Sequence, residues 1–258
     1  MEVKAVCRKG IVRMKSFIIT LGALVIWVAL LAPHVPAQRA SPDNTHRASP
    51  DNTQRATPNI TRLEAVSVSM STASYGGKSA IRLTKDPAIS EVDEPTFAKL
   101  KDVNFRNGSI EVKVRSRLLP NAPESARGFI GVAFRIDERN SKFECLYLRP
   151  TNGRAEVQLR RNRSTQYFSY PDFKFDRLRK EAPGEYESYV DIGLDEWIDL
   201  RIEVRGSKAR LFVNNAKEPV LIVNDLKHGP DLSGAVGLWV EVGTEGYFAD
   251  LKIQHDQH

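Results

Sequence analysis

The chain has 258 residues, 41% of them hydrophobic, with a formal net charge of +6 and two cysteines. This length suits one large domain or two ordinary ones, and the apolar content excludes a chain that is disordered throughout. Two cysteines exclude a small domain held together by disulfides and a zinc site of four thiolates. Residues 63–258 hold equal numbers of basic and acidic side chains, so the excess positive charge lies before residue 63. The net charge therefore does not indicate a nucleic-acid partner.

Residues 1–37 have the pattern of a signal peptide. Arg13 and Lys15 precede an almost unbroken apolar run, 17–32, and small residues up to Ala37 fit a signal peptidase site. The run is shorter than the ~20 residues that usually span a bilayer. We therefore expect cleavage and a secreted or periplasmic protein, which contacts the membrane only if this segment is not cleaved. Met14 is an alternative start.

Residues 38–62 are predicted to form a disordered linker. They contain three versions of an eight-residue unit, QRASPDNT, HRASPDNT and QRATPNIT. Each unit has a proline, and no large apolar side chain occurs before Ile60. Such a segment cannot bury enough surface to offset the entropy lost on ordering.

From residue 63 onward the chain consists of short runs rich in β-branched and aromatic residues, separated by Gly, Pro, Asn and Asp. This pattern predicts strands joined by turns. Many strands without helices between them favour an antiparallel sandwich over a parallel α/β sheet. We predict an all-β fold with one domain, 63–258, built as a jelly-roll sandwich of two antiparallel sheets. The predicted strands are 64–70, 79–84, 108–117, 128–137, 142–149, 186–191, 196–205, 208–213, 219–224, 234–241 and 246–253.

Three of these strands predict a groove on one concave sheet face. Opposite their core side chains they carry small, aromatic and charged residues, namely Gly131, Ala133, Arg135, Cys145, Tyr147, Arg149, Gly237, Trp239 and Glu241. Aromatic rings that stack on sugars, beside Arg and Glu that hydrogen-bond hydroxyls, make a saccharide groove. The alternative is an exposed face whose amphipathic side chains cover apolar surface. A register shift of one residue would exchange the two faces.

The phrases FRNGSIEVKV, GVAFR, EWIDLRIEVRGSKARLFVNN, GAVGLWVEV and YFADLKI, in this order, resemble the concanavalin A-like lectin/glucanase superfamily. Their order is similar to that in secreted bacterial domains of the 3-keto-disaccharide hydrolase and laminin G-like type. The resemblance implies a curved concanavalin A-like sandwich and a site arginine at Arg135. The glucanase motif E-x-D-x-x-E does not occur in the sequence, so no catalytic pair is carried over. Asp250 stands where related sandwiches place a calcium ligand, but one carboxylate does not supply the roughly six to eight oxygens that calcium takes.

Segment 150–185 is a basic and aromatic insertion. Between Arg149 and Lys180 there are nine Lys and Arg against three acidic residues, interleaved with five aromatic ones. The segment fits an anionic or polyhydroxylated glycan, bound by guanidinium forks and aromatic rings. Single-stranded nucleic acid would use the same residue types, but export argues against it. The third interpretation is a loop that folds over the sheet and pairs its arginines with domain acids. The residues expected to bind a ligand are Arg149, Asn152, Arg160, Arg161, Asn162, Gln166 and Tyr167, together with Arg135, Tyr147, Trp239 and Glu241 of the groove.

Three functions remain open from the sequence. The first is a secreted carbohydrate-binding domain without catalysis, which needs no cofactor unless calcium binds. The second is a glycoside hydrolase whose acid is Glu187, Asp191 or Glu241. The third is a surface interaction module. Histidine catalysis is disfavoured because His228 is the single histidine between residues 63 and 254.

Overall fold

The computed structural model describes residues 53–55 and 60–256, which belong to a compact unit formed by residues 48–258. The predicted signal peptide and most of the predicted linker lie outside the described residues. No helix in the described part of the chain is long and apolar enough to cross a membrane.

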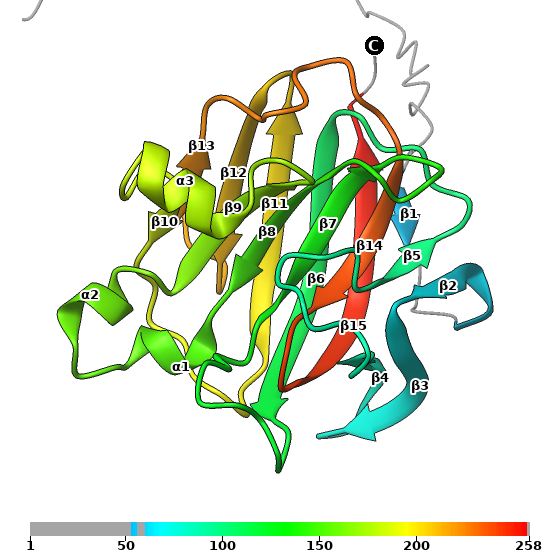
Figure 1. Cartoon of the computed structure of the whole chain (residues 1–258). Helices are drawn as coiled ribbons and strands as arrows, with labels where there is room; N and C mark the ends of the chain where they lie inside the picture. Colours follow the sequence, from blue (N-terminus) through cyan, green and yellow to red (C-terminus); the bar gives the residue numbers. More distant parts are fainter. Residues whose placement is uncertain (1–52, 56–59, 257–258) are drawn as a thin grey trace, which may run out of the picture. The chain divides into compact units, whose positions relative to one another are not determined.

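Two antiparallel sheets make up this unit (Figure 1). In spatial order, the eight-stranded sheet A contains β13 (Leu221–Val223), β12 (Lys208–Val213), β11 (Ile198–Arg205), β6 (Gly108–Leu118), β15 (Thr244–His255), β4 (Lys78–Lys85) and β3 (Val68–Tyr75), with β1 (Thr53–Arg55) paired to β15. The seven-stranded sheet B contains β10 (Glu187–Ser188), β9 (Thr165–Tyr170), β8 (Phe143–Leu148), β7 (Ile130–Ile136), β14 (Ala235–Val240), β5 (Phe97–Leu100) and β2 (Leu63–Val66). The predicted all-β jelly-roll sandwich of two antiparallel sheets is confirmed.

Two short pieces of the predicted linker are ordered. Residues 53–55 form β1, which pairs with residues 252–254 of β15, and Ile60–Arg62 form the 3₁₀ helix η1. The other strand on this side of β15 is β4, which pairs only with residues 245–248. β1 therefore covers a stretch of β15 edge that β4 leaves unpaired.

The predicted strand 64–70 is in fact two strands in different sheets. Ser67 has φ 49° and separates β2, which pairs with β5 in sheet B, from β3, which pairs with β4 in sheet A. A residue with positive φ ends the extended conformation, so the chain passes from one sheet to the other at this point.

Segment 150–185 is not one loop. It contains α1 (Pro150–Gly153), α2 (Gln158–Arg161), β9 and α3 (Phe175–Glu181). β9 is paired on both sides, with β8 and β10, and its Tyr167 and Phe168 are fully buried. Residues 165–170 of this segment therefore lie inside sheet B.

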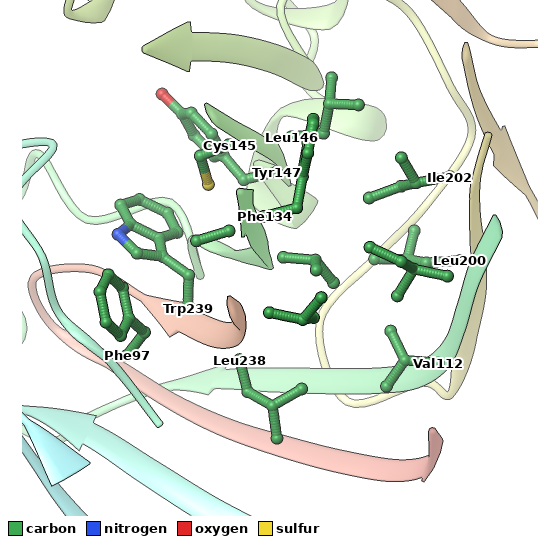
Figure 2. Close-up of a cluster of buried hydrophobic side chains, with 14 of the residues drawn as sticks. Phe97, Val112, Phe134, Cys145, Leu146, Tyr147, Leu200, Ile202, Leu238 and Trp239 are labelled. Carbon is green, nitrogen blue, oxygen red and sulfur yellow. The ribbon is translucent and has the colours of Figure 1, made fainter. Parts of the chain in front are cut away.

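Apolar side chains from both sheets form the core between them. Buried and partly exposed residues alternate along β6 and β11, as expected for strands with one solvated face. Figure 2 shows Val112, Leu200 and Ile202 of sheet A on one side of the core and Leu146 and Leu238 of sheet B facing them.

A second aromatic layer covers the other face of sheet B, on the side of Trp239, Tyr147 and Phe97 in Figure 2. Trp239 lies 4.9 Å from Tyr147 and 5.4 Å from Phe168 between ring centroids. Its indole Nε1 donates to the carbonyl of Glu94 at 3.0 Å, in the connection between β4 and β5. This connection and the segment containing α3 close over the layer, so most of this sheet face is not accessible.

Glycine makes room for the aromatic layer. Gly131 of β7 pairs with Tyr147 of β8, and a Cβ at residue 131 would lie 2.5 Å from Cβ of Tyr147 and 2.3 Å from the carbonyl oxygen of Leu146. Even alanine would collide at this position. Gly131 therefore allows β8 to lie close to β7, and Gly237 lies against the ring of Phe97, whose Cγ would be 3.1 Å from an added Cβ.

Candidate functional site

One end of the outer face of sheet B remains open as a cavity of about 300 Å³. It lies where β7 begins and where β8 and β14 end, beside α1 and α2 (Figure 1). Its lining residues come from six separate segments and are Val92, Asp93, Ser125, Arg127, Phe129, Tyr147, Arg149, Asn152, Arg160, Arg163, Phe175, Arg179, Glu241 and Val242.

Arg149 forms the centre of the cavity wall. It directly follows β8, and its backbone N–H donates to the carbonyl of Ser164 at 2.8 Å. Its Nη2 donates to the hydroxyl of Tyr147 at 2.6 Å, and its Nη1 donates to Oε1 of Glu187 at 3.0 Å. The guanidinium carbon also lies 5.6 Å from the ring centroid of Phe175. Arg149 is therefore held in one orientation before any ligand binds.

Glu187 is the anion that organises the arginines behind the cavity. Besides Arg149, it accepts from Arg179, and its Oε2 lies 3.3 Å from Nε of Arg163. Burial pushes the pKa of this carboxyl upward, but the hydrogen bonds and charges of Arg179 and Arg149 outweigh burial and hold the pKa below its usual value. One carboxylate thus serves three guanidinium groups.

Two further carboxyl groups, those of Asp93 and Glu241, lie on the opposite wall of the cavity. The backbone N–H of Asp93 donates to Oε2 of Glu241 at 2.9 Å, and Lys85 forms a buried ion pair with Oε1 of Glu241. Asp93 has φ 55°, and its own Oδ2 accepts from the backbone N–H of Phe175 at 2.8 Å. Burial raises the pKa of Asp93 to about 7, against the opposing effects of the Phe175 N–H and the Arg149 charge.

Two further arginines, Arg127 and Arg160, lie at the cavity rim. Arg127 donates to backbone carbonyls of its own turn, including that of Ala126 at 2.7 Å. Nε of Arg160 donates to Oδ1 of Asn152 at 3.3 Å, and Nδ2 of Asn152 donates to the carbonyl of Arg163 at 3.0 Å. The buried Asn152 side chain therefore positions Arg160.

The cavity brings together five of the residues proposed from the sequence to bind a ligand. They are Tyr147, Arg149, Asn152, Arg160 and Glu241. Arg161 and Asn162 belong to the end of α2, where Arg161 lies over the ring of Tyr189 and Asn162 accepts from Gln158 at 2.7 Å. These two residues do not line the cavity.

Arg135 lies on the opposite side of sheet B from the predicted groove. β7 has a bulge between the pairs Ile136–Ala235 and Ala133–Gly237, and Arg135 has φ 55°. Its fully buried guanidinium donates to the carbonyls of Arg106 at 2.8 Å and Gly206 at 2.8 Å, in loops of sheet A. The strict alternation assumed for 128–137 is wrong after residue 133, because a bulge changes the face on which the following side chains lie.

Trp239, Tyr167 and Gln166 are enclosed by the chain. Trp239 belongs to the covered aromatic layer. The hydroxyl of Tyr167 donates to Oε2 of Glu144 at 2.6 Å, beside the loop that contains His228. Gln166 is fully buried in β9, and its Nε2 donates to the carbonyl of Tyr186 at 3.3 Å. The predicted open face is therefore reduced to its end, near Arg149.

None of the three carboxylates considered for catalysis has the surroundings of a free acid. Both oxygens of Glu187 accept from arginines, and both oxygens of Glu241 accept hydrogen bonds. Asp191 is exposed, pairs with Arg154 at 2.6 Å, and does not line the cavity. The buried carboxyl that faces the cavity with a raised pKa is Asp93, which sequence reasoning missed.

The cavity residues that the sequence analysis did not select differ in how strongly the sequence pointed to them. Arg163 and Arg179 belong to the basic run that the sequence analysis identified, and their spacing gave no reason to prefer Arg160 and Arg161 to them. Asp93 and Arg127 lie in turn-like segments far from that run. The contacts that bring these two residues to the cavity join distant parts of the chain, so no local pattern could have selected them.

Asp250 lies in a bulge of β15, with φ 53° and Lys78 at 3.5 Å. It lines a different hollow, of about 460 Å³, on the outer face of sheet A. Within residues 53–55 and 60–256, no three His, Cys, Asp or Glu side chains are grouped so that they could hold a metal ion.

No family model matches the sequence, and no curated protein matches it. Solved structures show similarity in fold. Carbohydrate binding module CBM66 from Bacillus subtilis is 12% identical, with a TM-score of 0.47, and the match covers 74% of this chain and 98% of that chain. A protein with a galectin-like fold from Bacillus subtilis is 11% identical, with a TM-score of 0.47 and coverage of 79% and 94%. Domain 4 of AbnA, an extracellular arabinanase from Geobacillus stearothermophilus, is 12% identical, with a TM-score of 0.39 and coverage of 78% and 81%. Such identities and TM-scores assign neither a ligand nor an activity to this chain.

Proposed function

We propose that residues 63–258 form a carbohydrate-binding domain whose saccharide ligand occupies the cavity around Arg149. The cavity, at about 300 Å³, is at the lower end of the size range of ligand pockets. Its walls combine the rings of Phe129, Tyr147 and Phe175 with guanidinium and amide groups. Rings that contact the CH face of a sugar, beside forked donors to its hydroxyls, are the combination that saccharide binding requires.

The observation that carries this proposal is the fixed position of Arg149. A charged side chain buried in a cavity wall needs partners, and Glu187 and Tyr147 supply them. Because these partners already hold the guanidinium, binding a ligand costs little side-chain entropy. The site is preorganised.

The ligand is proposed to bind at the end of the outer face of sheet B, not across its middle. The middle is filled by Trp239, Phe168 and the segments that cover them. We propose binding without hydrolysis because both oxygens of Glu187 and of Glu241 are engaged within the protein. We also propose that the protein is exported, with the apolar segment 17–32 as the core of its signal peptide.

The test is to block the cavity mouth. Ser125 is exposed and lines the cavity, so Ser125→Trp adds a large side chain there without disturbing the core. Arg210→Trp, on the exposed face of sheet A, adds the same bulk elsewhere. A glycan array should show binding by the wild type and by Arg210→Trp and loss of binding by Ser125→Trp. Equal binding by both variants would place the saccharide elsewhere, and no binding to any glycan would contradict the function.

A further inference from the structure

We infer that the saccharide is acidic, and that its carboxylate or sulfate is bound by Arg127 and Arg160 at the cavity rim. This inference rests on the proposed function and specifies the class of ligand for the same site. It follows from a local excess of positive charge in a protein domain whose overall charges balance.

The cavity lining contains five arginines and two carboxyl groups. The arginines are Arg127, Arg149, Arg160, Arg163 and Arg179. The carboxyl groups are Asp93 and Glu241, and the charge of Glu241 is matched by its buried ion pair with Lys85. Behind the wall, Glu187 offsets one of the three arginines that contact it. The charges of the described residues therefore do not neutralise the cavity.

Arg127 and Arg160 carry this excess. Among the described residues neither one forms an ion pair, because Arg127 donates to backbone carbonyls and Arg160 donates to the Asn152 amide. The terminal nitrogens of Arg160 have no hydrogen-bond partner in the described chain. Donors that are oriented but unused are what two oxygens of a carboxylate or sulfate need for a forked pair of hydrogen bonds.

The surroundings of Arg127 agree with this interpretation. Burial lowers the pKa of its guanidinium, and the positive charges of Arg160 and Arg149 lower it further. Like charges held together in a partly buried site repel one another, and a bound anion would remove this repulsion. Three arginines directed toward one small space thus favour an anionic occupant.

The hollow on sheet A provides an internal comparison. It is larger, at about 460 Å³, but its acidic and basic lining residues are equal in number, namely Glu111, Asp199, Asp250, Lys113, Arg201 and Lys252. Lys113 pairs with Asp199 there, and Lys252 lies 3.5 Å from Glu111. Its cations are already paired, so the Arg149 cavity is the better anion site despite its smaller volume.

The experiment uses the full chain and a glycan array on which uronate and sulfated glycans have neutral counterparts, including trigalacturonate and its methyl ester. We expect acidic members to bind at least about tenfold more tightly than their counterparts, with an affinity that falls as salt rises. Uronate and sulfated members distinguish the two anions. Arg127→Gln and Arg160→Gln should each lower affinity about tenfold, since each removes a charge-assisted hydrogen bond. Arg210→Gln, on sheet A, should leave affinity unchanged.

Three results would overturn the inference. If neutral counterparts bind as tightly as acidic glycans and Ser125→Trp still abolishes binding, the site is a saccharide site without acid specificity. If acidic glycans bind but Arg127→Gln and Arg160→Gln have no effect, the anion is bound elsewhere. If no glycan binds, the inference and the proposed function both fail.

Discussion

Arg149 and Glu187 form a buried ion pair across 38 positions of the chain, with 3.0 Å between Nη1 and Oε1 and side-chain exposures of 6% and 4%. Arg149 follows β8, whereas Glu187 begins β10 at the edge of sheet B. The pair therefore fixes the end of β8 against the edge strand of its own sheet. It also holds the arginine that forms the cavity wall.

The contributions of Arg149 and Glu187 to stability should be coupled. Arg149→Met leaves the Glu187 carboxylate buried with two of its three cationic neighbours, and we expect a loss of about 2–4 kcal/mol in the free energy of unfolding. Glu187→Met takes the carboxylate from Arg149, Arg163 and Arg179, and the double variant should lose less than the sum of the two single losses, because Arg149 and Glu187 share one contact. Urea denaturation measures both. Additive losses from the two substitutions would show that the ion pair is not coupled, and Arg210→Met provides the exposed control.

Stability should depend on pH through Asp93. Burial raises the pKa of its carboxyl to about 7, well above that of an aspartate in an unfolded chain, so the folded state retains a proton that the unfolded state releases. The contribution of Asp93 to the free energy of unfolding is fully present below about pH 4 and is lost as pH rises to about 7. Asp93→Asn keeps an acceptor for the Phe175 N–H and cannot ionise.

The stability gained by Asp93→Asn over the wild type should therefore grow from near zero at about pH 4 to on the order of a few kcal/mol at about pH 8. Thermal unfolding at a series of pH values measures this difference. Asp191 is an exposed carboxylate, and the stability difference between Asp191→Asn and the wild type should not grow with pH in this way. A constant difference between Asp93→Asn and wild type at every pH would contradict the raised pKa, because Asp93 would then bind protons equally in the folded and unfolded states.

Arg135 should matter for stability and not for binding. Its guanidinium donates to carbonyls of Arg106, Gly206 and Gly229, which lie in three loops at the end opposite the cavity. Arg135→Met removes the donor from these partly buried carbonyls, with an expected loss of roughly 2–4 kcal/mol. Saccharide affinity, measured at a temperature where the variant is folded, should equal that of the wild type. A large loss of affinity in folded Arg135→Met would restore Arg135 as a site residue, as the family resemblance implied.

The two-sheet architecture could be predicted from sequence because it depends on alternation within single strands. Alternating side chains in 108–117 and 196–205 correctly gave β6 and β11 and their buried faces. The short strands β5 and β9 were missed because their residues are buried on both faces, so their sequences do not alternate.

The cavity could be predicted only in part, because its composition depends on tertiary contacts. Tyr147, Arg149 and Glu241 were found because they share the face predicted from alternation. Arg135 was assigned to the wrong face of sheet B because of one bulge in β7, and the sequence FRID gives no clear sign of that bulge. Trp239 was assigned to an open groove because the sequence does not show that the connection before β5 folds over it.

Nuclear magnetic resonance of the arginine Nε–Hε groups can locate the ligand on the protein. During titration with the best-binding glycan of the array, resonances of Arg149, Arg127 and Arg160 should shift together, with one common dissociation constant. Arg201, in the hollow of sheet A, should not shift. Shifts confined to Arg201 and its neighbours, with Arg149 unchanged, would show that the cavity on sheet B is not the saccharide site.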